Sequence, residues 1–203
     1  SQRHEANDNA AYLREQVKTL IKTIENTDYN KARTAAMALM VLPRRSTAPP
    51  LLKLLRDSNP LVKQNAVWAL GFCGDDSMAA TIKSLLKDRN TEVRRETVLA
   101  LKRLNASQSA PALMEALKTE TEQGVKYDIA RTLGTFGDRG AVFVLMNVLT
   151  KEKSWYVKSG CVEALGNIGG DMAMNALAKI LVTDAGEDAG WARTKAAWAL
   201  TAI

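Results

Sequence analysis

The chain has 203 residues, 46% of them apolar, and a formal net charge of +6 from 28 Lys and Arg against 22 Asp and Glu. This length and composition allow a substantial buried core, and no apolar run reaches the roughly 18 residues needed to cross a bilayer. The positive charge keeps nucleic acid, anionic membrane surfaces and acidic proteins among the partner classes. The basic residues are spread along the sequence rather than gathered in a tail, which weakens that inference.

The N-terminal part predicts two helices after a polar lead-in. Residues 1–9 carry no apolar stripe and are predicted to form a frayed segment. From residue 10 to Ile24, apolar side chains recur at helical spacing. Asp28 can accept a hydrogen bond at the start of a second helix that ends near Pro43.

Prolines and glycines mark the following elements. Pro49 and Pro50 predict the first turn of a third helix, where a missing N–H costs little. Glycine clusters at 71–74 and 134–140 predict helix ends, because glycine accepts the left-handed conformation that closes a helix. Asn105 stands at the end of a predicted helix, where other predicted helices have glycine, and asparagine is the next-best residue for that conformation.

The C-terminal part continues the alternation of helices and short turns. Pro111 is predicted to open one helix and Asp171 to cap another. The connection 183–190 is about three residues longer than its counterparts, so it is a place for an insertion or an added site. The last predicted helix runs to Ile203 with no polar closing helix after it, and the first residue is not methionine. We therefore expect either a part of a longer chain or a partner at that end.

One segment recurs with variations from one end of the sequence to the other, most clearly as Val-Lys-Ser-Gly-Cys-Val-Glu-Ala-Leu-Gly-Asn-Ile-Gly-Gly at 157–170. Copies begin with an apolar residue followed by a basic one, at intervals of 30, 31, 32, 32 and 35 residues. An internal repeat of this length predicts an all-α, right-handed α-solenoid of about six helical hairpins within residues 10–203. The predicted repeats are about 10–45, 46–74, 75–105, 106–137, 138–170 and 171–203.

The repeated pattern Asp-x-x-x-x-Val-Arg/Lys-x-x-Ala/Cys-x-x-Ala-Leu-Gly-x-Ile/Phe-Gly-Asp resembles the HEAT-like repeats of the phycobilisome-lyase type. Its best copies are 57–75 and 157–170, and the resemblance covers essentially the whole chain. It implies stacked helical hairpins. It says little about function, because the family includes chromophore lyases, scaffolds and regulatory subunits.

The basic residue of each copy forms a ladder with two interpretations. Such a row could bind phosphates along a groove, or each base could pair with an acidic residue of its own or a neighbouring turn. We favour the structural interpretation, since recurrent residues in repeat proteins usually maintain the stack. The ladder comprises Arg33, Lys63, Arg94, Lys126, Lys158 and Arg193.

Two slots, one turn apart on the second helix of each hairpin, vary between repeats and are better candidates for recognition. These helices should line the concave surface of a solenoid, and aromatic and Arg residues are enriched at binding hot spots. The alternative is that the tryptophans only fill gaps between repeats. The predicted partner-binding residues are Gln64, Trp68, Arg95, Leu99, Tyr127, Arg131, Glu163 and Trp198. Trp155 and Trp191, which precede the last two repeat helices, are expected to cover the stack edge.

Catalytic chemistry finds little support in the sequence. One histidine and two separated cysteines supply neither a zinc set nor a Cys-His pair. Cys73 and Cys161 are expected to be small, buried or half-buried fillers without a disulfide, which fits a cytoplasmic location. HEAT-like iron hydroxylases carry His-Glu pairs on successive helices, and here only His4-Glu5 occurs. A HEAT-like DNA glycosylase would combine an acid, an arginine and aromatic residues, but no matching motif is present.

The sequence thus favours a non-catalytic scaffold or adaptor that binds another protein on its concave face, with no cofactor, no metal and no catalytic residue. The first alternative is a subunit of a phycobilin lyase-like enzyme, acting with a partner chain. The second is nucleic-acid binding through the basic ladder.

Overall fold

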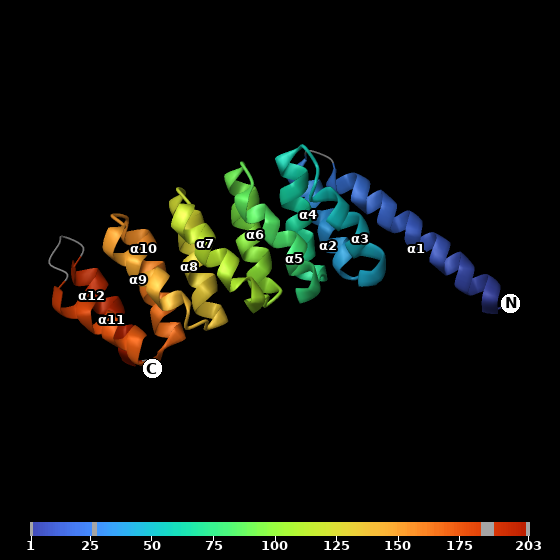
Figure 1. Cartoon of the computed structure of the whole chain (residues 1–203). Coiled ribbons are helices and arrows are strands. Elements are labelled where there is room, and N and C mark those ends of the chain that lie inside the picture. Colours follow the sequence, from blue (N-terminus) through green and yellow to red (C-terminus); the bar gives the residue numbers. More distant parts are fainter. Residues whose placement is uncertain (1, 26–27, 184–188, 202–203) are drawn as a thin grey trace. The chain divides into compact units, whose positions relative to one another are not determined.

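The computed structural model describes residues 2–25, 28–183 and 189–201, apart from the side chains of 2–8, 183, 189, 191 and 192. Contacts between Cα atoms divide the chain into two compact units, residues 1–104 (unit 1) and 105–203 (unit 2). Within the described residues all regular structure is helical, which confirms the predicted all-α class (Figure 1).

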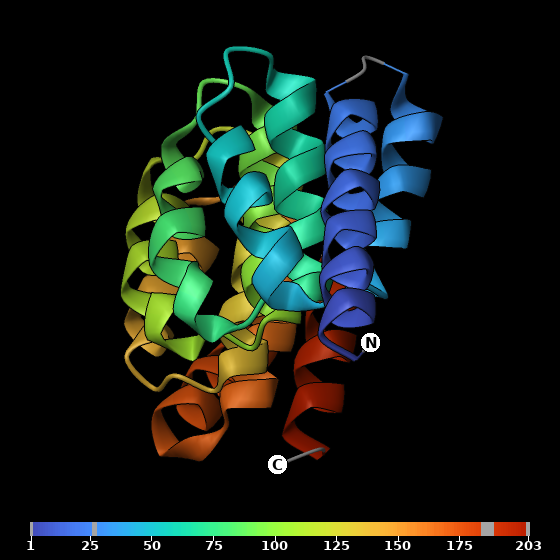
Figure 2. The same cartoon turned by 90° about the vertical axis from the view of Figure 1, so that its right-hand side faces the viewer.

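Unit 1 is built from three helical hairpins. The second helices of the hairpins pack side by side, and the first helices cover one side of them. Figure 2 shows the first helix lying beside the second. The helices are α1 (Gln2–Ile24), α2 (Tyr29–Met40), α3 (Arg44–Leu54), α4 (Pro60–Cys73), α5 (Ala79–Ile82), which continues as a 3-10 helix over Lys83–Lys87, and α6 (Thr91–Arg103).

Unit 2 repeats this arrangement. Helices α8, α10 and α12 pack in succession, and each contacts the first helix of its own hairpin. The six helices are α7 (Ala110–Thr119), α8 (Gln123–Phe136), α9 (Ala141–Lys151), α10 (Trp155–Ile168), α11 (Gly170–Thr183) and α12 (Ala189–Thr201).

The N-terminal segment differs from its prediction. Helix α1 begins at Gln2, so residues 2–9 are helical rather than a frayed lead-in. Glu, Gln, Arg and Ala have high helix propensity, and they can extend a helix that is already packed without an apolar stripe of their own. The next element is as predicted, because the Asp28 carboxylate accepts a hydrogen bond from the Lys31 N–H at 3.1 Å.

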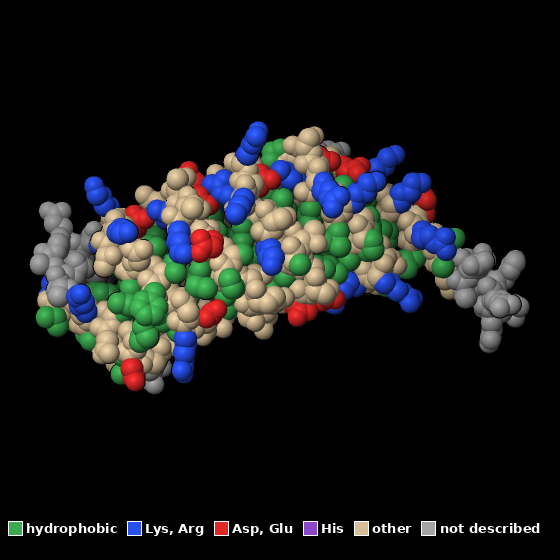
Figure 3. Space-filling view, viewed as in Figure 1, with side chains coloured by type: hydrophobic (Ala, Val, Ile, Leu, Met, Phe, Trp, Pro, Cys, Tyr) green, Lys and Arg blue, Asp and Glu red, His purple; other side chains and the backbone are tan. Residues whose placement is uncertain are grey.

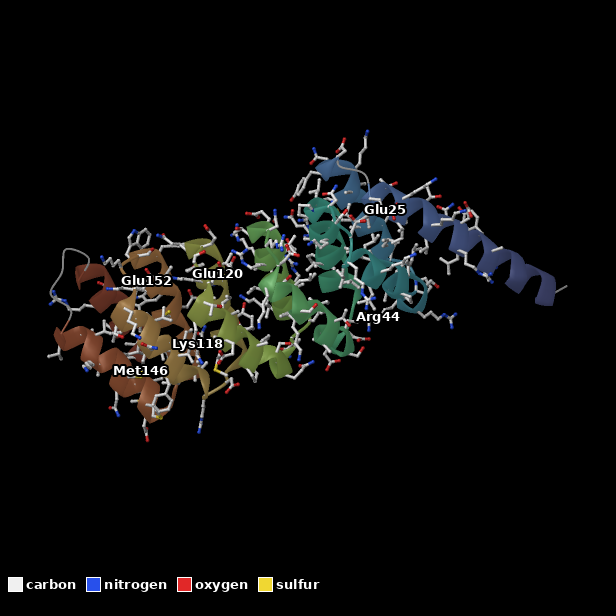
Figure 4. The ribbon with its side chains drawn as sticks, turned by 45° about the horizontal axis from the view of Figure 1, so that its top comes forward. Glu25, Arg44, Lys118, Glu120, Met146 and Glu152 are labelled. Carbon is white, nitrogen blue, oxygen red and sulfur yellow. The ribbon has the colours of Figure 1, made fainter. Side chains whose placement is uncertain are left out.

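The prolines of α3 also lie elsewhere than predicted. Helix α3 begins at Arg44 after Pro43, so Pro49 and Pro50 stand in its interior rather than in its first turn. An interior proline removes an intrahelical hydrogen bond, which is tolerated where the freed carbonyl can meet water. Arg44 is anchored by other contacts: its Nε donates to the carbonyl of Cys73 at 2.7 Å, and its Nη1 meets Asp75 at 2.9 Å (Figure 4).

The glycines of the Ala-Leu-Gly motif do not end the helices. Gly71, Gly134 and Gly166 lie inside α4, α8 and α10, where an added Cβ would stand 3.0, 2.6 and 2.7 Å from an alanine of the next second helix. They permit close helix–helix approach. The helices end later, for example at Gly137, which has φ +66°. Asn105 adopts the predicted left-handed conformation with φ 50°.

The core of each unit is a layer of Leu, Val, Ile and Ala side chains between first and second helices. The larger buried side chains include Leu39, Leu70 and Leu101 in unit 1, and Leu133 and Leu165 in unit 2. Four of these leucines belong to the repeated Ala-Leu pair, and Leu133 follows Thr132 at the same position of its copy, so the recurrent part of the sequence forms the core. Both cysteines are buried and free, as predicted.

Candidate functional site

A groove lined by aromatic residues lies on the second helices of unit 2. We call it the aromatic groove. Its volume is about 500 Å³, and Trp155 and Trp198 remain 54% and 76% exposed. A tryptophan so exposed contributes little to the core, and it offers a large apolar area to a partner. The groove is lined by Tyr127, Trp155, Tyr156, Ser159, Val162, Glu163, Gly166, Asn167, Lys195, Trp198 and Ala199.

One wall of the groove is the Tyr127 ring, which a glycine on the neighbouring helix leaves room for. A Cβ on Gly160 would lie 2.9 Å from Cδ2 of Tyr127, so only glycine leaves space for this ring over α10. Tyr127 then stacks on Tyr156, with ring centroids 4.2 Å apart and an interplanar angle of 18°. Trp155 meets Tyr156 edge to face at 6.0 Å. The three rings form a continuous aromatic surface at the N-terminal end of α10.

The charged residues beside these rings are already paired. Arg131 Nη2 lies 2.8 Å from Glu163 Oε1, and Arg131 Nε donates to the same oxygen at 2.9 Å. The hydrogen bond to Glu163 raises the pKa of Arg131, so the guanidinium stays charged. Its Cζ stands 5.5 Å from the centroid of Tyr127. In contrast, Lys195 has no ion-pair partner among the described residues.

The predicted residues of unit 1 lie in a different environment. Trp68 is half-buried because Arg33 covers it, with Cζ 4.4 Å from the ring centroid. Arg33 also lies 5.0 Å from the ring of Tyr29, and Trp68 packs against Phe72 at 4.7 Å. These aromatic faces are occupied by cations of the same unit, so they are less available to a partner.

One buried carboxylate holds these cations in place. Glu96 has a side chain only 8% exposed, and it pairs with Arg103 at 2.7 Å and with Arg33 at 3.4 Å. Arg103 in turn stands 4.5 Å from the ring of Phe72. The Arg33 side chain is 13% exposed, so its positive charge is compensated by Glu96 more than by water.

Several ladder residues make contacts within the stack. Lys63 pairs with Asp88, and Lys126 pairs with Glu152 at 2.7 Å; in both, the acid belongs to the turn before the following repeat helix (Figure 4). Arg94 Nη1 donates to the carbonyls of Asp88 and Arg89, at 3.0 and 3.3 Å. Lys158 is half-buried. Asp188, the acidic residue that precedes Arg193 in the sequence, lies outside the described residues.

The eight predicted partner-binding residues fall into two groups, one in each unit. In unit 2, Glu163, Tyr127 and Trp198 line the aromatic groove, and Arg131 contacts two of its residues. In unit 1, Gln64 and Leu99 are half-buried, and Arg95 is exposed. Trp155, which we expected at the stack edge, lines the groove; the Trp191 side chain is outside the described residues.

Sequence reasoning missed other groove residues, namely Tyr156, Asn167 and Lys195. Gly160 could have indicated the groove from the sequence alone. The corresponding residues in the preceding three copies are Asn65, Glu96 and Asp128, so a glycine at this position indicates that a neighbouring side chain needs the space. The buried role of Glu96 was missed for a different reason, since its two arginine partners lie 63 and 7 residues away.

Within the described residues, no three His, Cys, Asp or Glu side chains are grouped so that they could hold a metal ion. Likewise, no described helix is both long enough and apolar enough to span a bilayer.

The stacked hairpins and their repeated sequence define a class, the α-helical repeat proteins. A family model for HEAT repeats matches residues 17–102, 48–132 and 110–201, and the chain therefore belongs to the HEAT-repeat family. None of the curated protein sequences matches it.

Solved structures share the fold at low sequence identity. An engineered protein is 23% identical, with TM-score 0.55, over 91% of this chain and 96% of that one. The complex of CpcE and CpcF of phycocyanin lyase from Nostoc sp. PCC7120 is 19% identical, with TM-score 0.62, over 83% and 71%. Kap121p, solved bound to Pho4p, is 16% identical, with TM-score 0.63, over 96% of this chain but 23% of that one.

Proposed function

We propose that this protein is a non-catalytic interaction module that binds another protein through its second helices, with the aromatic groove of unit 2 as the principal contact. The observation that carries this proposal is the pair Trp155 and Trp198, both exposed and both lining one groove. Tryptophan, tyrosine and arginine dominate the binding energy of protein interfaces. Placed on a rigid helical scaffold, they would bind a partner with little rearrangement.

The structural relatives support the same class of function. Kap121p was solved bound to Pho4p, and a designed armadillo repeat protein was solved in complex with a (KR)4 peptide. The latter is 20% identical, with TM-score 0.54. These partners are those of the two relatives, and what this chain shares with them is the fold. Helical repeats with exposed second-helix side chains are suited to binding extended partners.

The test compares two double variants of the full chain. Trp155→Ala with Trp198→Ala removes both exposed indoles of the groove, whereas Tyr12→Ala with Phe143→Ala removes two aromatic residues of similar exposure, 68% and 67%, outside it. Affinity capture from a source extract, quantified by mass spectrometry, should lose its specific partner only with the first variant. Circular dichroism should show both variants folded. Equal capture by a folded groove variant would refute the proposal.

Within unit 1, a separate set of proposed partner-binding residues comprises Gln64, Trp68, Arg95 and Leu99. Trp68 is held by Arg33, so its contribution should be smaller than that of Trp198. A Trp68→Ala variant should therefore reduce partner affinity less than Trp198→Ala in the same assay.

One observation favours a second candidate function, a subunit of a phycobilin lyase-like enzyme. The complex of CpcE and CpcF has a TM-score of 0.62 to this chain, and the sequence resembles phycobilisome-lyase-type repeats. This candidate predicts a change in the absorption spectrum when the chain is mixed with a bilin, its apoprotein and a partner subunit. An unchanged spectrum would count against it.

The nucleic-acid alternative is weakened by the ladder itself. Lys63 and Lys126 are already paired with carboxylates. On the face shown in Figure 3, basic side chains are interspersed with acidic and hydrophobic ones. Phosphate contacts would make the affinity fall steeply with salt, so salt-insensitive or absent binding of a labelled oligonucleotide would exclude this alternative.

A further inference from the structure

The polar groups that the aromatic groove leaves unpaired are chiefly hydrogen-bond donors. Ser159 is engaged with the carbonyl of Tyr156 at 2.7 Å, and Glu163 is engaged with Arg131. The Lys195 ammonium and the Trp198 indole N–H are donors only, and they have no partner among the described residues. The Asn167 amide adds further donors together with one acceptor. The groove thus combines exposed ring faces with an excess of donors.

The excess of hydrogen-bond donors over acceptors in the groove determines which peptide conformation fits. A helix bonds its own carbonyls internally, and a β-strand needs an edge with alternating donors and acceptors, which helices cannot provide. A polyproline II segment has no internal hydrogen bonds, so its carbonyls remain free. Proline lacks the N–H, and a proline-rich segment therefore presents acceptors almost alone. Its rings also pack well against aromatic side chains.

The charge of the groove adds one element of specificity. The carboxylate of Glu163 is neutralised by Arg131, at 2.8 Å, whereas Lys195 has no counter-ion among the described residues. A partner with an acidic side chain beside its prolines would place that charge near Lys195. A basic partner would meet an unpaired cation.

We propose that the aromatic groove binds a proline-rich, extended segment of a partner protein that carries an acidic residue. The proline rings lie against Trp155, Tyr156 and Trp198, the carbonyls accept from the unpaired donors, and the acidic residue pairs with Lys195. This inference rests on the proposed function, because it names the partner chemistry of the same groove.

The experiment uses the full chain and three labelled peptides, with affinities measured by fluorescence anisotropy. The first peptide is acetyl-Pro-Pro-Glu-Pro-Pro-Glu-Pro-Pro-amide, the second has alanine in place of every proline, and the third has lysine in place of every glutamate. We expect the first to bind at least tenfold more tightly than either of the others. Trp198→Ala should abolish this binding, and the control Phe143→Ala should retain it. Lys195→Glu should invert the preference between the acidic and basic peptides.

Equal affinity for the alanine peptide, or no binding of the acidic proline peptide, would overturn the inference. The two proposals fail separately. If the groove variant loses its partner in the capture assay while no proline peptide binds, the interaction function stands and the proline specificity falls. If the proline peptide binds with the expected dependence on Trp198 and Lys195 but capture is unaffected, the peptide site stands and the proposed function falls.

Discussion

Replacing Gly134 and Gly124 by alanine, one at a time, should change stability in opposite directions although both lie in α8. At Gly134, the new Cβ would lie 2.6 Å from Cα of Ala164 and 2.9 Å from its Cβ. At Gly124, nothing lies within 4 Å of the new Cβ. The two substitutions are chemically identical, so their difference isolates the packing of α8 against α10.

The magnitudes follow from two opposing effects. Alanine in a helix is favoured over glycine by about 0.5–1 kcal/mol, and this gain applies at both positions. At Gly134 the clash is with backbone, which cannot rotate away, so α8 and α10 must separate; such overpacking costs roughly 1–3 kcal/mol. We expect Gly124→Ala to stabilise by about 0.5 kcal/mol and Gly134→Ala to destabilise by about 1–2 kcal/mol.

Urea unfolding followed by circular dichroism at 222 nm measures both changes in the full chain. Because repeat proteins can unfold in parts, the slope of each transition should be compared with that of the wild type before free energies are assigned. Ala164→Gly in the Gly134→Ala background should restore little, since the closest contact is Cα rather than Cβ. A Gly134→Ala variant as stable as Gly124→Ala would refute the close-approach argument.

Three further predictions concern buried charges and thiols. Glu96→Gln should destabilise the chain by about 2 kcal/mol, because Arg33 loses its charged partner in a site where water cannot replace it; a loss below about 0.5 kcal/mol in urea unfolding would contradict this. The hydrogen bond from Lys126 and the backbone N–H groups of Ser154 and Lys153 lower the pKa of Glu152. A lowered folded-state pKa contributes stability above the unfolded-state value, near 4.3, that is lost as the pH falls through the folded-state value. Glu152→Gln should therefore flatten the decline in melting temperature below about pH 4.5, and a decline of unchanged steepness would contradict this. Burial raises the pKa of the Cys161 thiol to about 12 and raises that of Cys73 as well. Ellman's reagent at pH 8 should thus titrate two thiols in the unfolded chain but neither quickly in the native one, and rapid native reaction would contradict this burial.

Much of the fold follows from the sequence because each repeat carries its own structural signals. The Ala-Leu pair forms the core, Asp28 caps α2, and Asn105 adopts the left-handed conformation. These are local effects of residue type and spacing. The predicted ends at 71–74 and 134–140 contain the observed ends at Cys73 and Phe136, but the packing role of Gly71 and Gly134 was missed, because the sequence does not say whether a glycine serves its own backbone or a neighbouring helix.

The candidate site was less predictable because it depends on contacts between repeats. Trp68 and Trp198 occupy the same slot, and nothing local distinguishes them. Yet Trp68 is covered by Arg33, whereas Trp198 is 76% exposed. The difference arises from which neighbours are cationic and where their counter-ions lie. Such information is present in the sequence only as pairs of residues 30 or 60 positions apart.

One slot accounts for much of the contrast between the two surfaces. In the third copy it holds Glu96, which binds Arg33 and Arg103 and so fixes two cations on the aromatic rings of unit 1. In the fifth copy it holds Gly160, which leaves room for Tyr127 to stack over α10 and wall the aromatic groove. In the last copy it holds Lys195, the unpaired cation of that groove. Substituting this slot in unit 2 should therefore change recognition by the aromatic groove, whereas substituting Glu96 in unit 1 also lowers stability.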